Sequence, residues 1–377
     1  MKRILLVTSV YTGSGHKSIS DSLVEQFSGM PDVEVMVADG FSFAGKLGVQ
    51  VSKIYKYTTR DKAATALYNI CWKYSNRHPS GYRISACLCR RRFLKCIRLF
   101  HPDLILTVHS MLNTVLTEML KMYHLDIPVV VLQADLVNIH SSWCNSDALV
   151  TICPSQEAYQ SSIRHGMPPE KLKVMGFPTR RQFCEMASYK DSGEVSHRGR
   201  PLRCMLMSGG EGSKELRRYA DSILAHTDVN LTIICGKNRM LFRRLQKKLG
   251  SKYNGQVKLL GFTENLERVM LDSDVLISRS SPNTIMEAVT MTIPVIMTGP
   301  ILMQETGTPE LMQKYGLGVI CSSPEEAPAI IRKLQENNAA LLQKIRAAQQ
   351  SFRSFENARE IAKYVAELAK PLDYIIE

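Results

Sequence analysis

Short apolar runs alternate with helical patterns along the whole chain, as is typical of parallel β-sheets covered by helices. The first apolar run, residues 3–10, is followed by a glycine-containing turn and by helical spacing from Lys17 to Phe27. Further strands are predicted at 33–39, 103–108, 128–133 and 148–153. The first half of the chain is therefore predicted to form a doubly wound α/β domain.

The same alternation restarts in the second half. A strand is predicted at 202–208, followed by a glycine-rich turn and a helix from Lys214. Residues 187–201 are polar and lack apolar periodicity, which indicates a linker. Later elements are predicted as strands at 230–235, 257–260, 275–278 and 294–297, and as helices at 326–335 and 357–369.

The chain of 377 residues is long enough for two domains. We expect an N-terminal domain at 1–186, the linker at 187–201, a C-terminal domain at 202–355, and a terminal helix at 356–377 that packs back on the first domain. The expected fold class is α/β, with two facing Rossmann-like doubly wound domains. Open sheets of this type bind ligands at the carboxyl ends of their strands, so a cleft between the domains is the expected ligand site.

Positive charge is concentrated in one segment. The chain holds 48 Lys+Arg and 35 Asp+Glu, and residues 46–98 alone contain thirteen basic residues with Asp61 as the single acid. Aromatic residues such as Trp72 and Tyr74 lie among them. This mixture is typical of contact with an anionic membrane. It is also compatible with a nucleic-acid surface or with a solvated basic helix face.

Composition excludes several classes of protein. With 45% apolar and 22% charged residues the chain is an ordinary globular protein rather than a disordered or collagen-like one. Its ten cysteines are scattered, and Cys87-Leu88-Cys89 lacks a partnering pair, so reduced thiols are expected rather than disulfides or zinc. No segment approaches the roughly 18 apolar residues of a membrane span, and the apolar run after Met1 is too short for a secretory signal.

In each half of the chain, a turn rich in small residues follows the first strand. Residues 13–18 (GSGHKS) lack the third glycine of the dinucleotide motif, and residues 208–213 (SGGEGS) lack the Walker spacing. Both turns still allow a ligand to approach the backbone and the N–H groups of a helix N-terminus. Taken singly, each is equally compatible with a tight connection, and His16 with a histidine that has no chemical role.

Polar residues between 280 and 305 suggest a nucleotide-sugar site. Residues 281–284 can donate hydrogen bonds to phosphate oxygens after a buried strand. A helix predicted to begin near Ile285 would place Glu287 in its first turn, where it can accept hydrogen bonds from a ribose. Gln304 and Glu305 offer groups for sugar hydroxyls. The D-x-D sequence at 272–274 directly precedes a strand, so we interpret it as structural and expect no metal site.

The order of these motifs resembles the GT-B glycosyltransferases, specifically the monogalactosyldiacylglycerol synthase and processive diacylglycerol glucosyltransferase group of family 28. The family's Gly-Pro-Gly-Thr turn stands here as Ser281-Pro282-Asn283-Thr284. The motifs that carry the resemblance are the turn at 13–18, His101-Pro102-Asp103, Gln133-Ala134-Asp135 with His140 and Trp143, Gly176-Phe177-Pro178, Gly209-Gly210-Glu211-Gly212, Gly261-Phe262-Thr263, 274–278, Glu287-Ala288 and Gln304-Glu305.

The resemblance implies an inverting transfer of a hexose from a UDP-sugar to the hydroxyl of a membrane diacylglycerol-type lipid, without a bound metal. His16 would be the general base, assisted by Asp135, with His140 and Trp143 lining the acceptor site. The donor residues implied are Gly15 for close approach to the first turn, Gly209, Gly210, Asn283 and Thr284 for the diphosphate, Phe262 and Thr263 for the uracil, Glu287 for the ribose, and Gln304 and Glu305 for the hexose.

The basic segment 46–98 would then hold the enzyme on an anionic membrane surface. We expect a cytoplasmic protein, peripheral on the inner face of the cell membrane, with no nucleic-acid partner. The alternatives are an N-acetylglucosamine transferase acting on a lipid-linked cell-wall precursor, a non-catalytic UDP-sugar or lipid-binding relative, a nucleic-acid-binding protein and a UDP-sugar epimerase. The donor sugar and the oligomeric state stay open.

Overall fold

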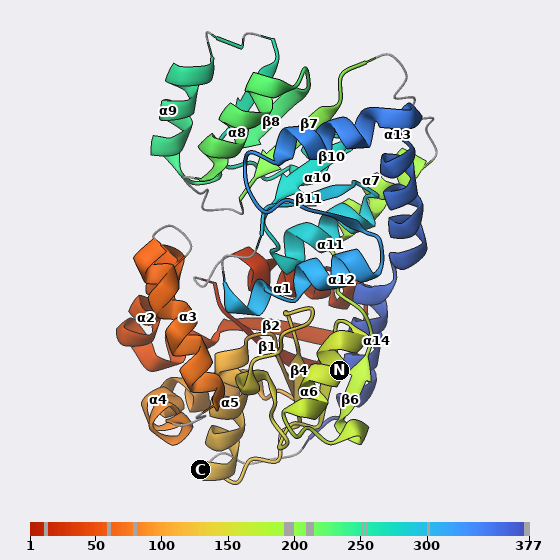
Figure 1. The fold of residues 1–377 in the computed structure, drawn as a ribbon. Coiled ribbons are helices and arrows are strands. Elements are labelled where there is room, and N and C mark those ends of the chain that lie inside the picture. The colour runs from red at the N-terminus through yellow and green to blue at the C-terminus, as the bar shows by residue number, and fades with distance from the viewer. Residues whose placement is uncertain are drawn as a thin grey trace. The chain divides into compact units, whose positions relative to one another are not determined.

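The chain forms two compact units in a computed structural model (Figure 1). Unit 1 comprises Met1–Arg180 and Glu356–Glu377, and unit 2 comprises Arg181–Phe355. Most of the expected linker lies outside the described residues. The structure describes residues 1–10, 14–58, 62–77, 81–191, 200–208, 215–250, 252–253, 255–299 and 302–372.

Unit 1 is built on a six-stranded parallel sheet with the order β2-β1-β3-β4-β5-β6. Its strands are β1 (Lys2–Thr8), β2 (Val33–Asp39), β3 (Leu104–Thr107), β4 (Val129–Leu132), β5 (Val150–Cys153) and β6 (Leu172–Val174). Its helices are α1 (Ser14–Phe27), η1 (Gly40–Ala44), α2 (Gly45–Thr58), α3 (Lys62–Arg77), α4 (Tyr82–Phe100), α5 (Ser110–Met122), η2 (Ser141–Trp143), α6 (Gln156–Arg164), η3 (Pro169–Lys171) and α14 (Asn357–Leu368).

The strand order of unit 1 reverses between β1 and β3. These two strands are adjacent, although α1, β2 and the helices η1 and α2–α4 separate them in the chain. At such a switch point the connections leave the sheet in opposite directions and open a crevice for ligands. A ligand site in unit 1 is therefore expected beside the residues that follow β1 and β3.

Apolar side chains of the inserted helix α4 fill part of the core of unit 1. The buried residues of α4 recur at helical spacing and pack with Leu5, Val7 and Ile105 of the sheet. They are Ala86, Cys89, Phe93, Ile97 and Phe100. The remaining faces of α4 carry the cluster Arg90, Arg91 and Arg92, so α4 is an amphipathic helix with its cations exposed.

The C-terminal helix α14 packs against α1, in unit 1. Asp103, at the entry to β3, is 1% exposed and accepts hydrogen bonds from the backbone N–H groups of Arg3 (2.7 Å) and Leu372 (3.0 Å). Near the start of α14, the Asn357 amide donates to the Phe177 carbonyl (3.3 Å). Two motifs that carry the family resemblance, His101-Pro102-Asp103 and Gly176-Phe177-Pro178, therefore fix the returning C-terminus.

Unit 2 contains a second six-stranded parallel sheet with the order β12-β11-β10-β7-β8-β9. Its strands are β7 (Arg203–Met207), β8 (Asn230–Ile234), β9 (Val257–Leu260), β10 (Val275–Ser278), β11 (Val295–Met297) and β12 (Gly318–Ile320). Its helices are α7 (Arg181–Asp191), α8 (Glu215–His226), α9 (Arg239–Leu249), α10 (Leu266–Leu271), α11 (Pro282–Thr290), η4 (Met303–Glu305), α12 (Thr308–Lys314) and α13 (Ala327–Phe352).

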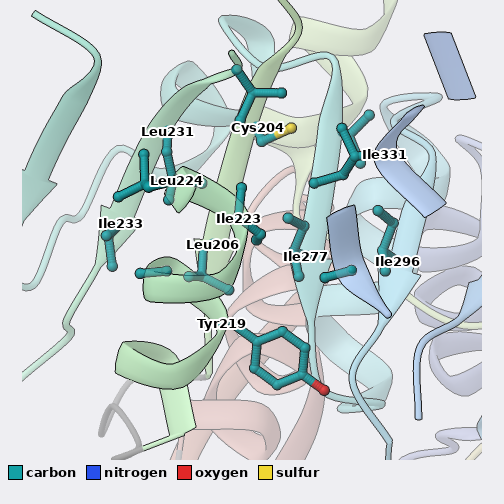
Figure 2. Close-up of a cluster of buried hydrophobic side chains, with 14 of the residues drawn as sticks. Cys204, Leu206, Tyr219, Ile223, Leu224, Leu231, Ile233, Ile277, Ile296 and Ile331 are labelled. Carbon is teal, nitrogen blue, oxygen red and sulfur yellow. The ribbon is translucent and has the colours of Figure 1, made fainter. Parts of the chain in front are cut away.

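The order in unit 2 reverses between β7 and β10, as in a Rossmann sheet. Figure 2 shows the core of this unit, where side chains of the strands meet those of α8 and α13. Leu206 and Ile277, on the adjacent strands β7 and β10, and Ile331 on α13 are all at most 1% exposed. This packing holds the carboxyl ends of β7 and β10 in place.

None of the described helices is both long and apolar enough to cross a membrane.

Candidate functional site

His16 lies at the switch point of unit 1, in the first turn of α1. Its Nδ1 is 2.7 Å from the Val108 carbonyl oxygen, at the end of β3. A carbonyl only accepts, so Nδ1 carries the hydrogen and Nε2 keeps a lone pair. Burial lowers the pKa of His16 to about 4, against a smaller opposing effect of the Val108 hydrogen bond. At neutral pH the imidazole is therefore uncharged and can accept a proton at Nε2.

A second histidine, His109, lies against His16 and was not predicted from the sequence. The two ring centroids are 4.4 Å apart, and the Phe41 ring meets His109 edge-on at 5.1 Å. His109 caps α5, because its Nδ1 accepts from the backbone N–H of Met111 (3.3 Å). Burial, and next the neighbouring His16, hold the pKa of His109 well below its usual range. The sequence could have indicated His109 by its position after β3, because His16 follows β1 in a similar way.

Asp135 contacts the indole of Trp143. The Trp143 Nε1 donates to Asp135 Oδ2 at 2.7 Å, and the Trp143 ring centroid lies 6.4 Å from that of His16. Trp143 is 1% exposed, so this hydrogen bond satisfies a buried donor. The structure thus places Trp143 in contact with Asp135 and near His16.

His140 links α3 to the short helix η2. Its Nδ1 accepts from the Ser142 backbone N–H (3.0 Å), and its Nε2 is 3.2 Å from the Trp72 carbonyl oxygen. Beside it, the Ser141 backbone N–H donates to Asn76 Oδ1 at 2.6 Å. Both ring nitrogens of His140 are therefore engaged, and the residue connects the basic segment to the loop that carries Trp143.

Helix α3 turns apolar side chains outward. Leu67, Ile70 and Tyr74 are 63%, 65% and 68% exposed, and their spacing of three and four residues puts them on one helix face. The exposed Cys71 and Lys73 lie beside them. Isolated exposed apolar residues are common, but a stripe at helical spacing indicates an interaction surface.

In unit 2, α11 begins at Pro282, three residues earlier than predicted. Proline is favoured at the first helical position, because its missing N–H would have no helical partner there. Glu287 therefore lies in the second turn of α11, and its expected place in the first turn was wrong. It is 5% exposed, Thr284 is 7% exposed, and Asn283 is half-buried nearer the helix start.

Arg279 and Glu305 form a buried ion pair beside the start of α11. Arg279 Nη2 is 3.7 Å from Glu305 Oε1, and Gln304 lies half-buried next to it in η4. Within the described residues, Arg279 Nε and the hydroxyls of Ser278 and Ser280 are buried without a hydrogen-bond partner. Such polar groups at the end of a strand are suited to a polar ligand. Arg279 was not predicted, although its position just past β10 was the available signal.

The other predicted donor residues are distributed over three places. Phe262 is 54% exposed, and Lys237 Nζ lies 4.9 Å from the centre of its ring. The Thr263 hydroxyl accepts from the Asn265 backbone N–H (3.3 Å) before α10. Gly15 lies in the first turn of α1 in unit 1. Gly209 and Gly210 lie outside the described residues.

Asp274 of the D-x-D sequence binds two arginines. Arg200 Nη1 and Arg203 Nη2 lie 2.7 and 3.0 Å from its carboxylate oxygens. Burial opposes ionisation, but these hydrogen bonds outweigh it and keep the pKa of Asp274 below its usual range. Across the described ranges, no group of three His, Cys, Asp or Glu side chains is placed to hold a metal ion.

Two family models match the chain, one in each unit. The model described as monogalactosyldiacylglycerol (MGDG) synthase matches residues 16–179, and the model described as the glycosyltransferase family 28 C-terminal domain matches residues 204–301. The first match contains His16, Asp135 and Trp143. The second contains Phe262, Arg279 and Glu287.

Named relatives cover most of the chain. It is 27% identical over 344 residues to the probable monogalactosyldiacylglycerol synthase 2, chloroplastic, of Oryza sativa subsp. indica, covering 86% of this chain and 72% of the relative. It is 26% identical over 340 residues to the chloroplastic monogalactosyldiacylglycerol synthase of Spinacia oleracea, covering 86% of this chain and 64% of that protein. The expected location, in the cytoplasm on the inner face of the cell membrane, was wrong, because these relatives are chloroplastic plant enzymes.

Solved structures confirm the expected GT-B fold. MurG of Acinetobacter baumannii superposes with a TM-score of 0.67 at 12% identity, covering 97% of this chain and all of that one. HepE of Anabaena, solved in complex with UDP-glucose, superposes with a TM-score of 0.58 at 14% identity, with the same coverage.

Proposed function

We propose that the chain, whose two halves match the monogalactosyldiacylglycerol synthase model and the family 28 glycosyltransferase C-terminal model, transfers galactose from UDP-galactose to diacylglycerol. The relatives' names support galactose as the sugar and diacylglycerol as the acceptor. The observation that carries the proposal is the uncharged His16 at the β1/β3 switch point, within the segment that matches the synthase family.

In the proposed reaction, His16 is the general base. The sn-3 hydroxyl of diacylglycerol gives its proton to Nε2 while its oxygen forms a bond to C1 of the galactose. The bond from C1 to the β-phosphate oxygen breaks, and UDP leaves with the electron pair. The Val108 carbonyl, bonded to Nδ1–H, fixes the tautomer and stabilises the imidazolium that forms. Attack from the face opposite the phosphate inverts the configuration at C1.

Asp135 would stabilise the same imidazolium at longer range. Its carboxylate is held by the Trp143 indole, whose ring lies near His16. A negative charge near a developing positive charge lowers the energy of the transition state without taking the proton itself. We therefore assign Asp135 an electrostatic role and Trp143 the role of positioning it.

Donor binding is proposed for the residues beside β10 in unit 2. Asn283 and Thr284, at the start of α11, would donate to the diphosphate, and the helix N-terminus favours the departing negative charge. Arg279 and Ser280 add donors at the same strand end. Glu287 would accept from the ribose hydroxyls, and Gln304 and Glu305 would bind the galactose hydroxyls. Gly209 and Gly210 would complete the diphosphate contacts, Phe262 and Thr263 would contact the uracil, and Gly15 would give access to the first turn.

The basic segment 46–98 is proposed to contact the membrane that supplies diacylglycerol. Its cations fit anionic headgroups, and the exposed Leu67, Ile70 and Tyr74 of α3 fit the interfacial layer. Because His140 and Asn76 join α3 to the loop of Trp143, this contact would lie directly beside the acceptor residues.

The test is UDP release from anionic vesicles that contain diacylglycerol, with UDP-glucose, UDP-galactose or UDP-N-acetylglucosamine as donor. We expect diacylglycerol-dependent release with UDP-galactose, reduced about 10²- to 10⁴-fold in His16→Ala and strongly reduced in Glu287→Ala. The exposed His226→Ala on α8 is the matched control and should keep full activity. UDP binding without release from any donor would instead support the non-catalytic alternative.

A further inference from the structure

A second basic surface lies on unit 2. Residues 229–263 contain no acidic residue, and eight basic ones. Five of the eight lie on the eleven-residue helix α9. The eight are Lys237, Arg239, Arg243, Arg244, Lys247, Lys248, Lys252 and Lys258.

The apolar face of helix α9 packs on the core of unit 2, and its basic side chains point into solvent. Leu241, Leu245 and Leu249 are buried in the core of unit 2, and the helix packs on the edge strand β9. Asn238 caps its start by accepting from the Leu241 backbone N–H at 2.9 Å. Each of the five basic side chains of α9 is exposed, as is Met240, which is 63% exposed. The charged face is therefore held rigidly by the fold.

Within the part of the chain that the structure describes, most of the basic side chains of α9 have no ion-pair partner. Lys248 pairs with Asp221 at 2.6 Å. Among the described residues, Arg239, Arg243, Arg244 and Lys247 form no ion pair. Four like charges on three helical turns repel one another, and an anionic partner removes that repulsion.

We propose that α9 of unit 2 is a docking surface for the anionic headgroups of a lipid bilayer. This inference rests on the proposed function, because an enzyme whose acceptor is a membrane lipid works beside such a surface. Charge complementarity identifies the occupant, since dispersed cations with one exposed methionine fit a headgroup layer. A single-stranded nucleic acid would need exposed aromatic rings for base stacking beside the cations. The one aromatic residue of α9, Phe242, packs on the core, and the exposed Phe262 lies outside α9, in the loop before α10.

The consequence is that each unit contacts the bilayer through its own cations. Each basic residue near an anionic surface strengthens binding by about fivefold, so three that all face the surface would strengthen it by about 100-fold. Side chains that point away from the surface contribute less, which widens the expected range to about 10- to 100-fold. The attraction is screened over about 8 Å at physiological salt, so only side chains at the surface contribute.

The experiment compares two triple variants of the full chain. One carries Arg243→Gln, Arg244→Gln and Lys247→Gln on α9, and the control carries Arg268→Gln, Lys333→Gln and Lys344→Gln at exposed positions elsewhere in unit 2. Binding is measured by co-sedimentation with phosphatidylcholine vesicles containing phosphatidylglycerol, without donor. We expect about 10- to 100-fold weaker binding for the α9 variant and little change for the control.

Equal weakening by both variants would overturn the proposal, because total charge would then explain binding. Unchanged vesicle binding by the α9 variant would also overturn the proposal. So would an α9 variant that binds vesicles like the parent and loses only the binding of a single-stranded RNA. UDP release from detergent-solubilised diacylglycerol is measured in parallel and should be the same in both variants and the parent. Absence of release in the parent would refute the proposed transferase activity, while the vesicle result would still decide the role of α9.

Discussion

The charge state of His16 determines whether it can act as a base. Its pKa is lowered to about 4 by burial, so the imidazole is already unprotonated in weakly acidic solution. We expect kcat/KM to stay level from about pH 8 down to about pH 5 and to fall as the pH approaches 4. A pH–rate profile with detergent-solubilised diacylglycerol checks this. A fall centred near the ordinary histidine value of about 6.5 would show that His16 is not the group that titrates.

The same low pKa makes folding depend on pH. Unfolded His16 binds a proton below about pH 6.5 and folded His16 only below about pH 4, so stability is lost as the pH falls through that window. For this residue the loss between pH 7 and pH 5 is about 2 kcal/mol. Urea unfolding of the parent and of His16→Gln should therefore show a smaller loss in the variant. An equal loss in both would contradict the assigned pKa.

Arg279 gives the clearest prediction for the donor site. Replacing it by glutamine removes the cation beside Glu305 and leaves that carboxylate buried without its ion pair. We expect KM for the UDP-sugar to rise about 10-fold or more, with Arg268→Gln on the surface of α10 as the control. If Arg279→Gln lowered only the thermal stability and left KM unchanged, the residue would have a packing role alone.

Residues at strand ends show what the sequence could predict and what it could not. His16 and Glu287 were predicted as candidates because each lies in a recognisable motif. His109 and Arg279 belong to no such motif, and they become candidates only through the parallel pairing of β1 with β3 and of β7 with β10. β1 and β3 are about a hundred residues apart in the chain, and β7 and β10 are about seventy apart, so local sequence patterns do not reveal that they pair.

At the level of elements, His140 and Asn76 attach α3 to η2. His140→Ala removes the hydrogen bonds by which its ring joins Trp72 of α3 to Ser142 of η2. We expect faster amide exchange over 62–77 and slower transfer from vesicles, with the rate on detergent-solubilised diacylglycerol less affected. His124→Ala, at an exposed turn in unit 1, is the control. Unchanged exchange in α3 would show that its packing against α2 is sufficient.

The apolar pattern predicted every strand of both sheets except β6 and β12. The strands at 33–39, 257–260 and 275–278 match the structure. The three-residue strands β6 and β12 were missed, because such short edge strands show no periodicity. The start of α11 was placed too late, because Pro282 was interpreted as part of a turn when it opens the helix.

For the molecule as a whole, the proposed membrane contact is electrostatic in origin. Basic side chains of α2–α4 in unit 1 and of α9 in unit 2 would both contribute, so the affinity for anionic vesicles should fall steeply with salt. Raising the ionic strength from about 0.05 M to about 0.5 M shortens the Debye length about threefold. UDP binding to the same protein, which depends on contacts within the site, should change far less. Equal salt dependence of both would contradict the account.

Analysis of the lipid product shows whether galactose is transferred to diacylglycerol. The full chain is incubated with UDP-galactose labelled in the sugar and with diacylglycerol, and the lipid extract is examined by mass spectrometry and by NMR of the anomeric proton. We predict a β-linked monogalactosyl diacylglycerol that is absent with His16→Ala. Label recovered only as free sugar or as an epimerised UDP-sugar, or transferred only to a lipid-linked cell-wall precursor, would contradict the account.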